Sequence, residues 1–522
     1  MKNRGDEFSN ASEPPMDWVG DWSGRRRTLT PDRTAVIEPH TQTTLTYRAL
    51  DDRACALAAR LADDYGLGPG DRLALVARNR LEALVLFLAC GKIGAVLAPV
   101  SHRLAPAEIE ALLQRLAPAV VATDSPVMEG LGDVLPPTTP VYDLDIPLTQ
   151  PADGAAPVNR PLSPGALAML IHTGGSTGLP KICRVSHRQM IWNAIELLVS
   201  APESMARRRE LLLFPLFHIG GWNTAIPVLY AGGTVILQPA FDAETVLANI
   251  DRYDVNHLGA VEAMLQALRA APNFERASLR SLEGITVAGG PCSQKTMEAF
   301  LDRGVAVNQA YGLTEAGPSN LVDAADDVGL DEQRARAGSV GTSFYHCDYR
   351  IIDPDTGQRV GTGEVGELQL RSPHSFDGYW DDPSASAARW AEAGWLRSGD
   401  LAREAADGRV RIVGRLDNVI ISGGEKVAAE EIEAALAAHP AVNAALVFAM
   451  SDPRWGQRPV AVFTSDAPIT MDALRDWLRP RLASYKQPAD VMQVTSLPLT
   501  GSGKPDRQQA RADYQNALRG RS

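Results

Sequence analysis

Short apolar runs alternate with helical patterns over the first three hundred residues of the chain. Leu81, Leu84, Val85 and Leu88 recur at the spacing of one helix face, and this helical segment lies between two apolar runs. The apolar runs, each long enough for one strand, lie at 72–77, 95–99, 120–123, 166–172, 211–215, 234–237, 255–260, 285–288 and 305–309. Apolar strands separated by helices are typical of α/β layers, so we expect largely parallel sheets with helices between them.

Around residue 349 the pattern changes to alternating strands joined by tight turns. Residues 349–353 (YRIID) and 366–372 (GELQLRS) alternate apolar and polar positions, and the turn sequence PDTGQ follows the first of them. Little helical pattern lies between these two segments. We predict a β-rich subdomain at about 340–415, which completes an N-terminal α/β domain over 1–415.

A third pattern begins after residue 415. Apolar positions at helical spacing predict helices at 428–438 and near 471–482, and an apolar run at 444–448 predicts a strand between them. We therefore predict a small α+β C-terminal domain over 416–522.

Composition places the chain among ordinary globular proteins. Of its 522 residues, 45% are hydrophobic and 22% are charged, and the formal net charge is −12. A net negative charge does not suit the phosphates of a nucleic acid, so we expect small molecules as partners and no nucleic acid. The sequence leaves a monomer and a homodimer equally open.

Export and membrane insertion are not expected. The five cysteines lie far apart without a CxxC pair, which argues against a zinc ribbon or a disulfide framework and suits a reducing compartment. The N-terminus lacks the apolar segment of a signal peptide. The most apolar stretch, Ala83–Val100, is interrupted by Lys92 and is too short to span a bilayer. We therefore predict a cytoplasmic protein without a membrane span.

The densest chemical signal is HTGGSTGLPK at residues 172–181, directly after an apolar run. Glycines and hydroxyl side chains let N–H and O–H groups approach phosphate oxygens closely, and the lysine adds positive charge. The spacing is not that of a Walker A loop, because the lysine follows a proline. We predict a phosphate-binding loop made by Thr173, Gly174, Gly175, Ser176, Thr177, Gly178 and Lys181.

Two other patterns give competing interpretations. The pattern GxSxG at 174–178 fits the nucleophile elbow of serine hydrolases, but that elbow needs a helix directly after the serine, and Pro180 follows closely. The pattern GxGxxG at 361–366 fits the dinucleotide fingerprint, but it leads into an alternating strand and opens no helix. We expect a hairpin turn there and predict neither NAD nor FAD. A serine hydrolase and a nucleotide-binding module without catalysis remain the alternatives from other classes.

Together with several further segments, this loop resembles the adenylate-forming superfamily of acyl-CoA synthetases, nonribosomal-peptide adenylation domains and luciferases. The resemblance runs from about residue 45 to 507 and is closest to acyl-CoA ligases. The family loop usually reads TSGTTGxPKG, and this chain departs from it at Gly174, Ser176 and Ile182. Three hydroxyl residues remain in the loop, so we expect that ATP binding is retained.

The resemblance implies roles around the adenine and the acyl group. FPLFH at 214–218 resembles a segment whose histidine, here His218, borders the acyl pocket and is a catalytic candidate. YGLTE at 311–315 resembles the YGxTE segment, in which Tyr311 would stack on adenine, Thr314 would contact phosphate and Glu315 would hold Mg²⁺. The nucleotide-binding residues implied here are Gly289, Gly290, Pro291, Gln309, Ala310, Tyr311, Gly312 and Thr314.

Three segments nearer the C-terminus complete the resemblance. LRSGD at 396–400 resembles the YRTGD motif, so Asp400 is expected to accept hydrogen bonds from both ribose hydroxyls. GRLD at 414–417 implies that Arg415 reaches the nucleotide and that Asp417 is the hinge of a mobile small domain. LPLTGSGK at 497–504 resembles the LPxTxxGK motif, whose lysine, Lys504, is the main catalytic candidate.

The implied activity is ATP-dependent activation of a carboxylic acid with Mg²⁺. A carboxylate is a poor electrophile, so attack on the α-phosphorus of ATP would give an acyl-adenylate and pyrophosphate. Coenzyme A is the expected acceptor, and an amine acceptor that gives an amide is the alternative. The acyl pocket is expected at 218–223, 261–263 and 289–290. Glu262 either pairs with the acid or points away, and Trp222 would favour an aromatic or medium-length acid.

Overall fold

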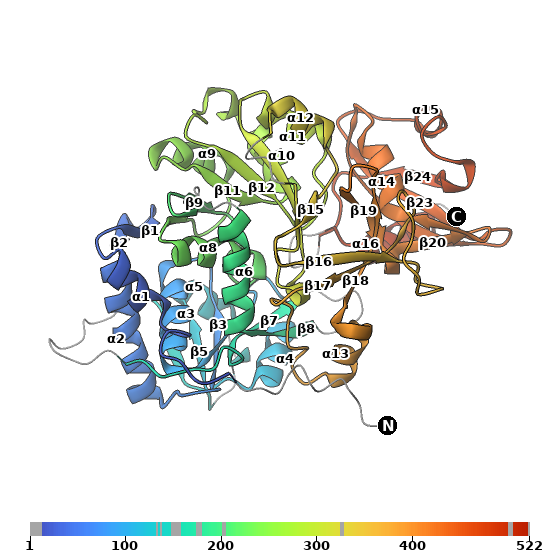
Figure 1. Ribbon diagram of the computed structural model, residues 1–522. Helices are drawn as coiled ribbons and strands as arrows, with labels where there is room; N and C mark the ends of the chain where they lie inside the picture. The colour runs from blue at the N-terminus through green and yellow to red at the C-terminus, as the bar shows by residue number, and fades with distance from the viewer. Residues whose placement is uncertain are drawn as a thin grey trace, which may run out of the picture.

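The computed structural model describes residues 13–131, 134–135, 138–147, 158–173, 180–200, 205–323, 328–499 and 505–519. Sheets layered with helices form the large N-terminal part, and a smaller C-terminal part lies against one side of it (Figure 1). Among the described helices, none combines the length and the apolar character that crossing a bilayer needs. All five cysteines are free thiols.

The first large sheet has the strand order β6-β5-β3-β4-β7-β8. Its strands are parallel except for the antiparallel pair β7 and β8, in which Thr173 pairs with Lys181. The strands are β3 (Arg72–Val76), β4 (Val96–Pro99), β5 (Val120–Thr123), β6 (Val141–Asp143), β7 (Leu167–Thr173) and β8 (Lys181–Ser186). The helices of this part are α1 (Trp22–Leu29), α2 (Tyr47–Tyr65), α3 (Leu81–Ile93), α4 (Pro106–Leu116) and α5 (Ser125–Leu131).

The second large sheet has the order β15-β14-β13-β12-β11-β9-β10-β1-β2. The strands from β13 to β1 are parallel, and both edges are antiparallel. The strands are β1 (Thr34–Glu38), β2 (Thr43–Thr46), β9 (Arg209–Leu212), β10 (Thr234–Leu237), β11 (His257–Ala260), β12 (Gly284–Val287), β13 (Ala306–Tyr311), β14 (Leu321–Val322) and β15 (Thr342–Ser343). The helices are α6 (His187–Ser200), α8 (Ile219–Ala231), α9 (Ala243–Arg252), α10 (Glu262–Ala270), α11 (Gln294–Leu301) and α12 (Leu330–Ala335). The predicted α/β fold with largely parallel sheets is confirmed.

Helix α3 explains the apolar stretch that Lys92 interrupts. Apolar residues lie on all sides of the helix, and nearly all of them are buried, so α3 is a core helix. Lys92 is only 1% exposed, and its Nζ lies 2.8 Å from Asp51 Oδ1 and also contacts Asp21 Oδ1. The two carboxylates, from α2 and from the residue before α1, compensate the buried ammonium group and join three helices.

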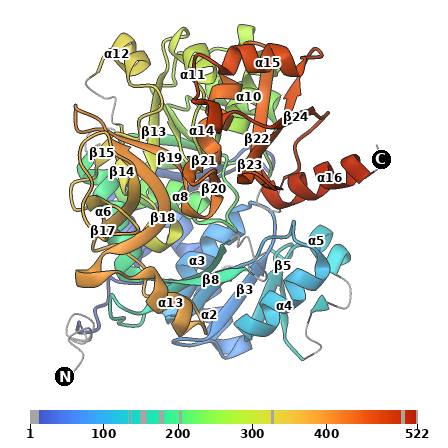
Figure 2. The same ribbon diagram turned by 90° about the vertical axis from the view of Figure 1, so that its right-hand side faces the viewer.

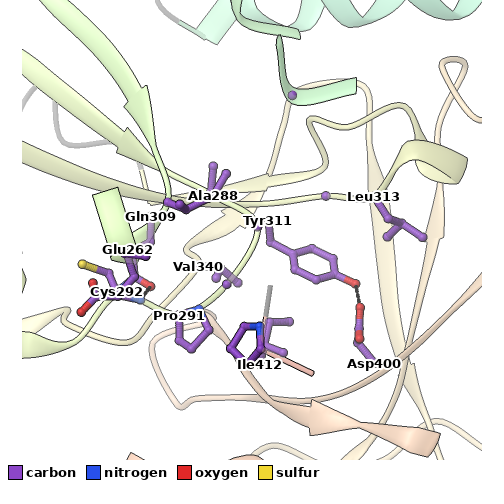
Figure 3. Close-up of a pocket in the computed structure, with 18 of the residues that line it drawn as sticks. Glu262, Ala288, Pro291, Cys292, Gln309, Tyr311, Leu313, Val340, Asp400 and Ile412 are labelled. Atoms are coloured by element: carbon purple, nitrogen blue, oxygen red, sulfur yellow. Dashed lines mark hydrogen bonds between the residues drawn. The ribbon is translucent and has the colours of Figure 1, made fainter. Parts of the chain in front are cut away.

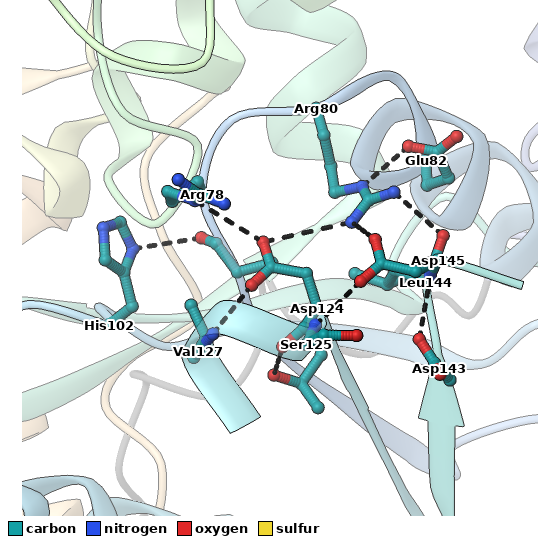
Figure 4. A network of polar contacts seen from close by, with 12 residues as sticks. Arg78, Arg80, Glu82, His102, Asp124, Ser125, Val127, Asp143, Leu144 and Asp145 are labelled. Carbon is teal, nitrogen blue, oxygen red and sulfur yellow. Dashed lines mark hydrogen bonds and ion pairs between the residues drawn. The ribbon is translucent and has the colours of Figure 1, made fainter. Parts of the chain in front are cut away.

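A second polar network ties together the loops after β3, β5 and β6 (Figure 4). Arg80 donates to Asp145 Oδ1 and Glu82 Oε2, each at 2.7 Å, and lies 3.9 Å from Asp124 Oδ2. The backbone N–H of Ser125 donates to Asp145 Oδ2 at 2.9 Å. This backbone hydrogen bond and the Arg80 guanidinium lower the pKa of Asp145 to about 2, so the carboxylate remains charged at neutral pH.

The chain then leaves the large sheets for an antiparallel sheet of order β16-β17-β18-β19. Its strands are β16 (Asp348–Ile352), β17 (Gly366–Arg371), β18 (Leu396–Glu404) and β19 (Val410–Arg415), and α13 (Pro383–Arg389) precedes β18. The GxGxxG pattern forms a turn before β17, in which Gly363 has a φ of 85° and the N–H of Gly361 donates to Glu364. The expected hairpin turn is therefore confirmed.

A separate sheet follows after a short 3₁₀ turn, Leu416–Asn418. Its strands are β20 (Val419–Ser422), β21 (Glu425–Ala428), β22 (Val442–Asp452), β23 (Gly456–Ser465) and β24 (Asp490–Gln493). Helices α14 (Ala429–Ala437), α15 (Met471–Leu478) and α16 (Arg507–Arg519) accompany it, and Figure 2 shows this part of the chain in orange and red beside the large sheets. Asp417 lies in the 3₁₀ turn, and its side chain is 76% exposed.

Candidate active site

A cavity of about 4430 Å³ lies where the large sheet of β9 to β15, the β16–β19 sheet and the C-terminal part meet. Its walls include the carboxyl ends of β11, β12 and β13, strands β18 and β19, and residues of the small C-terminal part. Ligands of α/β proteins commonly bind at the carboxyl ends of parallel strands. The volume exceeds what one small ligand fills, so several connected subsites are expected.

Tyr311 and Asp400 meet at the wall of this cavity (Figure 3). The Tyr311 hydroxyl donates to Asp400 Oδ2 at 2.5 Å, and Arg415 Nη1 lies 2.9 Å from Asp400 Oδ1. The backbone N–H of Asp400 donates to Ser398 Oγ at 2.9 Å, which holds the main chain of this residue in strand β18. The sequence-predicted residues Tyr311, Asp400 and Arg415 are thus brought together by hydrogen bonds and one ion pair.

Burial determines the protonation states of Asp400 and Tyr311. Desolvation raises the pKa of Asp400, and the charge of Arg415 and the Tyr311 hydrogen bond oppose that rise. Burial and the nearby carboxylate raise the pKa of Tyr311 well above its usual value, so its hydroxyl stays protonated. Tyr311 is therefore the donor, and each carboxylate oxygen of Asp400 keeps acceptor capacity for a further hydrogen bond.

An apolar slot lies beside this carboxylate. Tyr311 faces it from one side, with Pro291, Val340 and Ile412 across from the ring (Figure 3). Aromatic and aliphatic walls next to a hydrogen-bond acceptor suit a planar base joined to a sugar. Val340 and Ile412 belong to no motif, so sequence patterns could not identify them.

Glu315 is held by two residues from the β-rich region. The Tyr379 hydroxyl donates to Glu315 Oε1 at 2.6 Å, and Arg389 Nη2 lies 3.2 Å from the same oxygen. Arg389 Nε also donates to the Tyr379 hydroxyl oxygen at 3.0 Å. Burial and the Glu315 charge raise the pKa of Tyr379, which keeps it a donor. Tyr379 and Arg389 lie outside the motifs that the sequence pattern identified.

Lys181 also contacts Tyr379. Its Nζ lies 5.0 Å from the centroid of the Tyr379 ring, a distance at which an ammonium group is attracted to an aromatic face. Tyr379 therefore connects the lysine predicted to bind phosphate with the carboxylate predicted to bind a metal ion. Thr173, which pairs with Lys181 across β7 and β8, lines the same cavity.

The chemistry of Glu315 fits a magnesium ion. Among the residues that the structure describes, no group of three or more His, Cys, Asp or Glu side chains could hold a metal ion by itself. Magnesium usually takes one or two carboxylates and completes its shell with water and substrate phosphates. No hydrogen bond within the described residues reaches Glu315 Oε2, so the second carboxylate oxygen of this buried residue remains for a cation.

Six predicted site residues lie outside the described residues: Gly174, Gly175, Ser176, Thr177, Gly178 and Lys504. The described residues next to these segments line the cavity, namely Thr173 and Pro180 in one case and Leu499 and Pro505 in the other. The chain resumes at Lys181 as strand β8 and not as a helix, which argues against the nucleophile elbow of a serine hydrolase.

The remaining predicted residues line the cavity in different ways. His218 caps helix α8, where its Nδ1 accepts a hydrogen bond from the N–H of Gly220 at 3.0 Å. Gly312 passes so close to Pro318 that a Cβ would lie 1.8 Å from its carbonyl oxygen, so only glycine fits there. Gln309 is turned toward the loop after β12, where its Oε1 accepts from the N–H of Cys292. The others on the cavity wall are Gly289, Gly290, Ala310 and Thr314.

Two family models match the chain. The model described as AMP-binding enzyme matches residues 25–380, and the model described as AMP-binding enzyme C-terminal domain matches residues 431–504. The chain belongs to the AMP-binding enzyme family. The family resemblance expected from the motifs is thereby confirmed.

Two relatives with known names align with nearly the whole chain. A feruloyl-CoA synthase from an Amycolatopsis species is 36% identical over 494 residues, which cover 93% of this chain and 97% of that protein. An indoleacetate–CoA ligase from Aromatoleum aromaticum is 33% identical and covers 93% of this chain and 96% of its own length.

Two solved structures of AMP-binding enzymes have the same fold. One is o-succinylbenzoate-CoA synthetase from Bacillus subtilis in complex with the acyl-adenylate intermediate, with a TM-score of 0.82, 28% identity, and coverage of 94% of this chain and 98% of that one. The other is the amide bond synthetase McbA from Marinactinospora thermotolerans, with a TM-score of 0.85, 26% identity, and coverage of 95% and 99%.

The structure decides between the two orientations expected for Glu262 and corrects one prediction about Trp222. The Glu262 carboxylate is bonded within the protein, because its Oε1 accepts from Ser293 Oγ at 2.7 Å and from Thr296 Oγ1 at 2.8 Å at the start of α11, which agrees with the alternative that it does not pair with the acid. Trp222 is 1% exposed and packs on Phe87 with 5.3 Å between ring centroids, so it belongs to the core. The prediction that Trp222 selects the acid is therefore wrong.

Proposed function

We propose that this AMP-binding enzyme uses ATP to convert a carboxylic acid to an acyl-adenylate and then transfers the acyl group to coenzyme A. The observation that carries the proposal is the convergence of two groups in one cavity. Tyr311, Asp400 and Arg415 form the first group. Glu315, with Tyr379, Arg389 and Lys181 around it, forms the second.

The first group supplies the binding site for the nucleoside of ATP. Adenine would lie against the Tyr311 ring in the slot that Pro291 and Ile412 close from the other side. The Asp400 carboxylate would accept hydrogen bonds from the two ribose hydroxyls, since each of its oxygens has a further lone pair. Arg415 and the Tyr311 hydroxyl hold that carboxylate in place before the nucleotide binds.

The second group supplies charge at the phosphates. In the first half-reaction, a carboxylate oxygen of the acid attacks the α-phosphorus of ATP, and the bond between that phosphorus and the pyrophosphate oxygen breaks. Lys181, Lys504 and the hydroxyl groups of the 173–178 loop would stabilise charge that develops on the phosphate oxygens. Magnesium, held by Glu315 Oε2 together with phosphate oxygens, would neutralise part of the charge of the leaving pyrophosphate.

In the second half-reaction the thiol of coenzyme A would attack the carbonyl carbon of the acyl-adenylate. The carbon–oxygen bond to AMP breaks, AMP leaves, and the thiol proton is released. The acceptor is supported by the similar proteins named above, three of which are named as CoA synthases, ligases or synthetases. The exposed 3₁₀ turn around Asp417 would serve as the hinge that moves Lys504 out of the cavity between the two steps.

A second acceptor has a specific observation in its favour. The chain has 26% identity and a TM-score of 0.85 to an amide bond synthetase. In that case the same acyl-adenylate would react with an amine and form an amide bond. The adenylation residues would be unchanged, and only the group that attacks the acyl carbon would differ.

The test is a screen for acid-dependent release of pyrophosphate and AMP. The purified chain receives ATP, MgCl₂ and a broad set of carboxylic acids, each alone, with coenzyme A and with a set of primary amines. We expect AMP to form only when an acid is present, and a thioester to form when coenzyme A is also present. The Asp400→Asn variant, purified in the same way, controls for contaminating ligases. Acyl-adenylate that persists with coenzyme A but disappears with an amine would replace the thioester step by amide synthesis. No AMP with any acid would refute the adenylation itself.

A further inference from the structure

Helix α6 carries three polar side chains that are buried on one face. Gln189, Asn193 and Glu196 are 1%, 5% and 0% exposed, and spacings of four and three residues place them on the same side of the helix. A buried polar group is unfavourable unless it is hydrogen-bonded, so each of these side chains requires a partner. Each one bonds a different segment that is distant in sequence, and two of these segments line the cavity.

Gln189 bonds the turn Thr314–Ala316, which carries Glu315 and which we call the metal turn. Gln189 Nε2 donates to the carbonyl oxygen of Thr314 at 3.1 Å, across 125 residues of the chain. A carbonyl oxygen can only accept, so this contact fixes which end of the Gln189 amide faces the turn. Thr314 and Glu315 line the cavity and Gln189 does not, so Gln189 supports this part of the wall from outside the cavity.

The other two carbonyl groups of the metal turn are bonded as well. The carbonyl oxygen of Glu315 accepts from the N–H of Phe376 at 2.8 Å. The carbonyl oxygen of Ala316 accepts from Asn320 Nδ2 at 2.9 Å and from Ser372 Oγ at 3.4 Å. Three consecutive carbonyl groups are thus held by donors from α6, from the segment 372–376 and from the loop after the turn. The backbone of the metal turn is therefore fixed at every residue, and with it the starting direction of the Glu315 side chain.

Asn193, one helical turn further along α6, bonds helix α8. Asn193 Nδ2 lies 2.5 Å from Asn223 Oδ1, and the two helices lie side by side (Figure 1). The Asn223 amide also bonds Ser319 Oγ at 3.3 Å. Asn193 therefore holds a side chain of the acyl wall, by which we mean the residues of α8 that line the cavity. These are Ile219, Gly220, Asn223, Thr224, Pro227 and Val228.

The third side chain of the face bonds a segment away from the cavity. Glu196 Oε1 accepts from the backbone N–H of His346 at 3.1 Å and lies 2.6 Å from His346 Nδ1. Neither Glu196 nor His346 lines the cavity. Because Glu196 lies on the same helix face and is equally buried, it shows what the loss of a buried polar contact does to the fold alone.

We propose that Gln189 and Asn193 are positioning residues for adenylation: Gln189 holds the metal turn for magnesium and ATP, and Asn193 holds the acyl wall for the acid. This inference rests on the proposed function. Neither side chain lines the cavity, so each acts through the residue that it bonds. Because both bonds start from one rigid helix, the metal turn and the acyl wall keep a fixed separation. Adenylation requires this, since the carboxylate must meet the α-phosphorus in line with the leaving pyrophosphate.

The two residues should change different kinetic constants. Acid-dependent pyrophosphate release is measured with the acid that gives the most AMP in the screen described above, while MgCl₂, ATP and that acid are varied in turn. Gln189→Met keeps the length of the side chain and leaves a buried carbonyl without its donor. We expect the half-maximal Mg²⁺ concentration and KM for ATP to rise about 5- to 10-fold, and KM for the acid to change less than about twofold.

Asn193→Leu should give the opposite result. It removes the amide at similar volume, so KM for the acid should rise about 5- to 10-fold while the half-maximal Mg²⁺ concentration changes less than about twofold. Saturating Mg²⁺ should restore most of the rate in Gln189→Met and none of it in Asn193→Leu. Transfer from supplied acyl-adenylate to coenzyme A, which does not use the metal turn, should be retained in Gln189→Met.

Two milder variants keep the test possible if a larger change prevents folding, which thermal unfolding detects. Ser372→Ala removes a half-buried donor to Ala316 and should raise the half-maximal Mg²⁺ concentration about two- to threefold. Asn193→Ser keeps a small polar group and should raise KM for the acid in the same direction as Asn193→Leu. The matched control, Glu196→Gln, weakens the contact with His346 and should change neither constant.

The outcomes separate this inference from the function beneath it. Equal changes of both constants in Gln189→Met and Asn193→Leu would overturn it, because α6 would then support the fold as a whole. The same shifts in Glu196→Gln would also overturn it. An unchanged Mg²⁺ dependence in Gln189→Met and Ser372→Ala would remove the part that concerns the metal turn. No pyrophosphate from the unmodified chain with any acid would contradict the proposed function itself, and the inference with it.

Discussion

We call the part of the cavity around Tyr311 and Asp400 the nucleotide half, and the part along β11, β12 and β13 the acyl half. In the nucleotide half, Tyr311 and Arg415 bond the two carboxylate oxygens of Asp400. In the acyl half, Asn308 has a buried amide oxygen without a partner among the described residues. Tyr311 and Arg415 hold the Asp400 carboxylate without any ligand, so the group proposed to bind the ribose is already oriented. In the second case, no hydrogen bond from the described residues holds that amide oxygen in place.

The two halves of the cavity also differ in how well sequence motifs identify their residues. In the nucleotide half, Tyr311 and Asp400 each lie in a short motif, because neighbouring residues along the chain shape one turn. In the acyl half, Glu210, His257, Thr286 and Asn308 come from four different strands and share no motif. The residues of a motif are thus found from neighbouring positions in the sequence, while the residues of this sheet face are brought together only by the register of strands far apart in the chain.

The largest expected effect tests whether the nucleotide half depends on one residue from the C-terminal part. Lys504→Ala should lower acid-dependent pyrophosphate release about 10²- to 10³-fold, because it removes positive charge from the developing phosphate charge. Transfer from supplied acyl-adenylate to coenzyme A should be largely retained, since Lys504 is proposed to act only in the first step. Both rates are measured by single-turnover quench, with Lys295→Ala on α11 as the control. Equal loss of both half-reactions would show that Lys504 does not act in adenylation alone.

The second-largest effect tests whether Tyr379 positions Glu315 and Lys181 in the nucleotide half. Tyr379→Phe removes the hydroxyl that donates to Glu315 and keeps the ring that Lys181 contacts. We expect kcat/KM for ATP to fall about 10- to 100-fold, as for the loss of a hydrogen bond to a charged group, with half-maximal activity at a higher Mg²⁺ concentration.

The matched control for Tyr379 is Tyr349→Phe. The Tyr349 hydroxyl donates to Glu404 at 2.9 Å in the same β-rich region but away from the cavity. A magnesium dependence that is unchanged in Tyr379→Phe, or shifted equally in the control, would show that Tyr379 supports the fold only.

Much of the fold was predictable from apolar periodicity. The strands at 120–123 and 234–237 have the predicted bounds, because buried parallel strands are continuous apolar runs. The predicted strand at 211–215 ends at Leu212, since Phe214 leaves the sheet and packs on Gly259. Helix α16 gave no signal: only Ala510 and Tyr514 are buried on it, so most of its positions are polar.

The site was predictable only where residues of one motif act together. Tyr379 and Arg389 were missed because they reach Glu315 across a separate part of the chain, 64 and 74 residues away in sequence. Trp222 was misassigned because an aromatic residue after the histidine segment fits a pocket wall and a core equally well. Only the direction of helix α8 decides between them, and sequence spacing does not give that direction.

A smaller effect is expected in the pH dependence of AMP binding, which depends on Asp400 in the nucleotide half of the cavity. Burial raises the pKa of Asp400 above the ordinary value of 3.8, so on acidification this carboxyl protonates at a higher pH than an exposed one. The protonated form accepts fewer hydrogen bonds from ribose, so affinity for AMP should fall as pH falls through the raised pKa, by about tenfold per pH unit at most. The sign for folding is opposite, because ionising a buried acid costs stability and protonation restores it.

Calorimetric titration with AMP between pH 7.5 and pH 4.5 measures the affinity. Asp400→Asn should bind AMP more weakly at pH 7.5 and show a flatter pH profile. An equally steep profile in the variant would assign the pH dependence to another group.

The smallest effect concerns an exposed ion pair whose two residues also line the cavity. Lys426 on β21 pairs with Asp355 after β16, and the two side chains are 56% and 71% exposed. An exposed ion pair contributes about 0.5 kcal/mol or less, so Lys426→Ala should change either half-reaction by no more than about twofold. Asp355→Ala and the double variant complete a cycle measured by single-turnover rates at low and high salt. A tenfold change confined to one half-reaction would contradict this expectation, because it would mean that one surface pair sets the position of the C-terminal domain over the cavity.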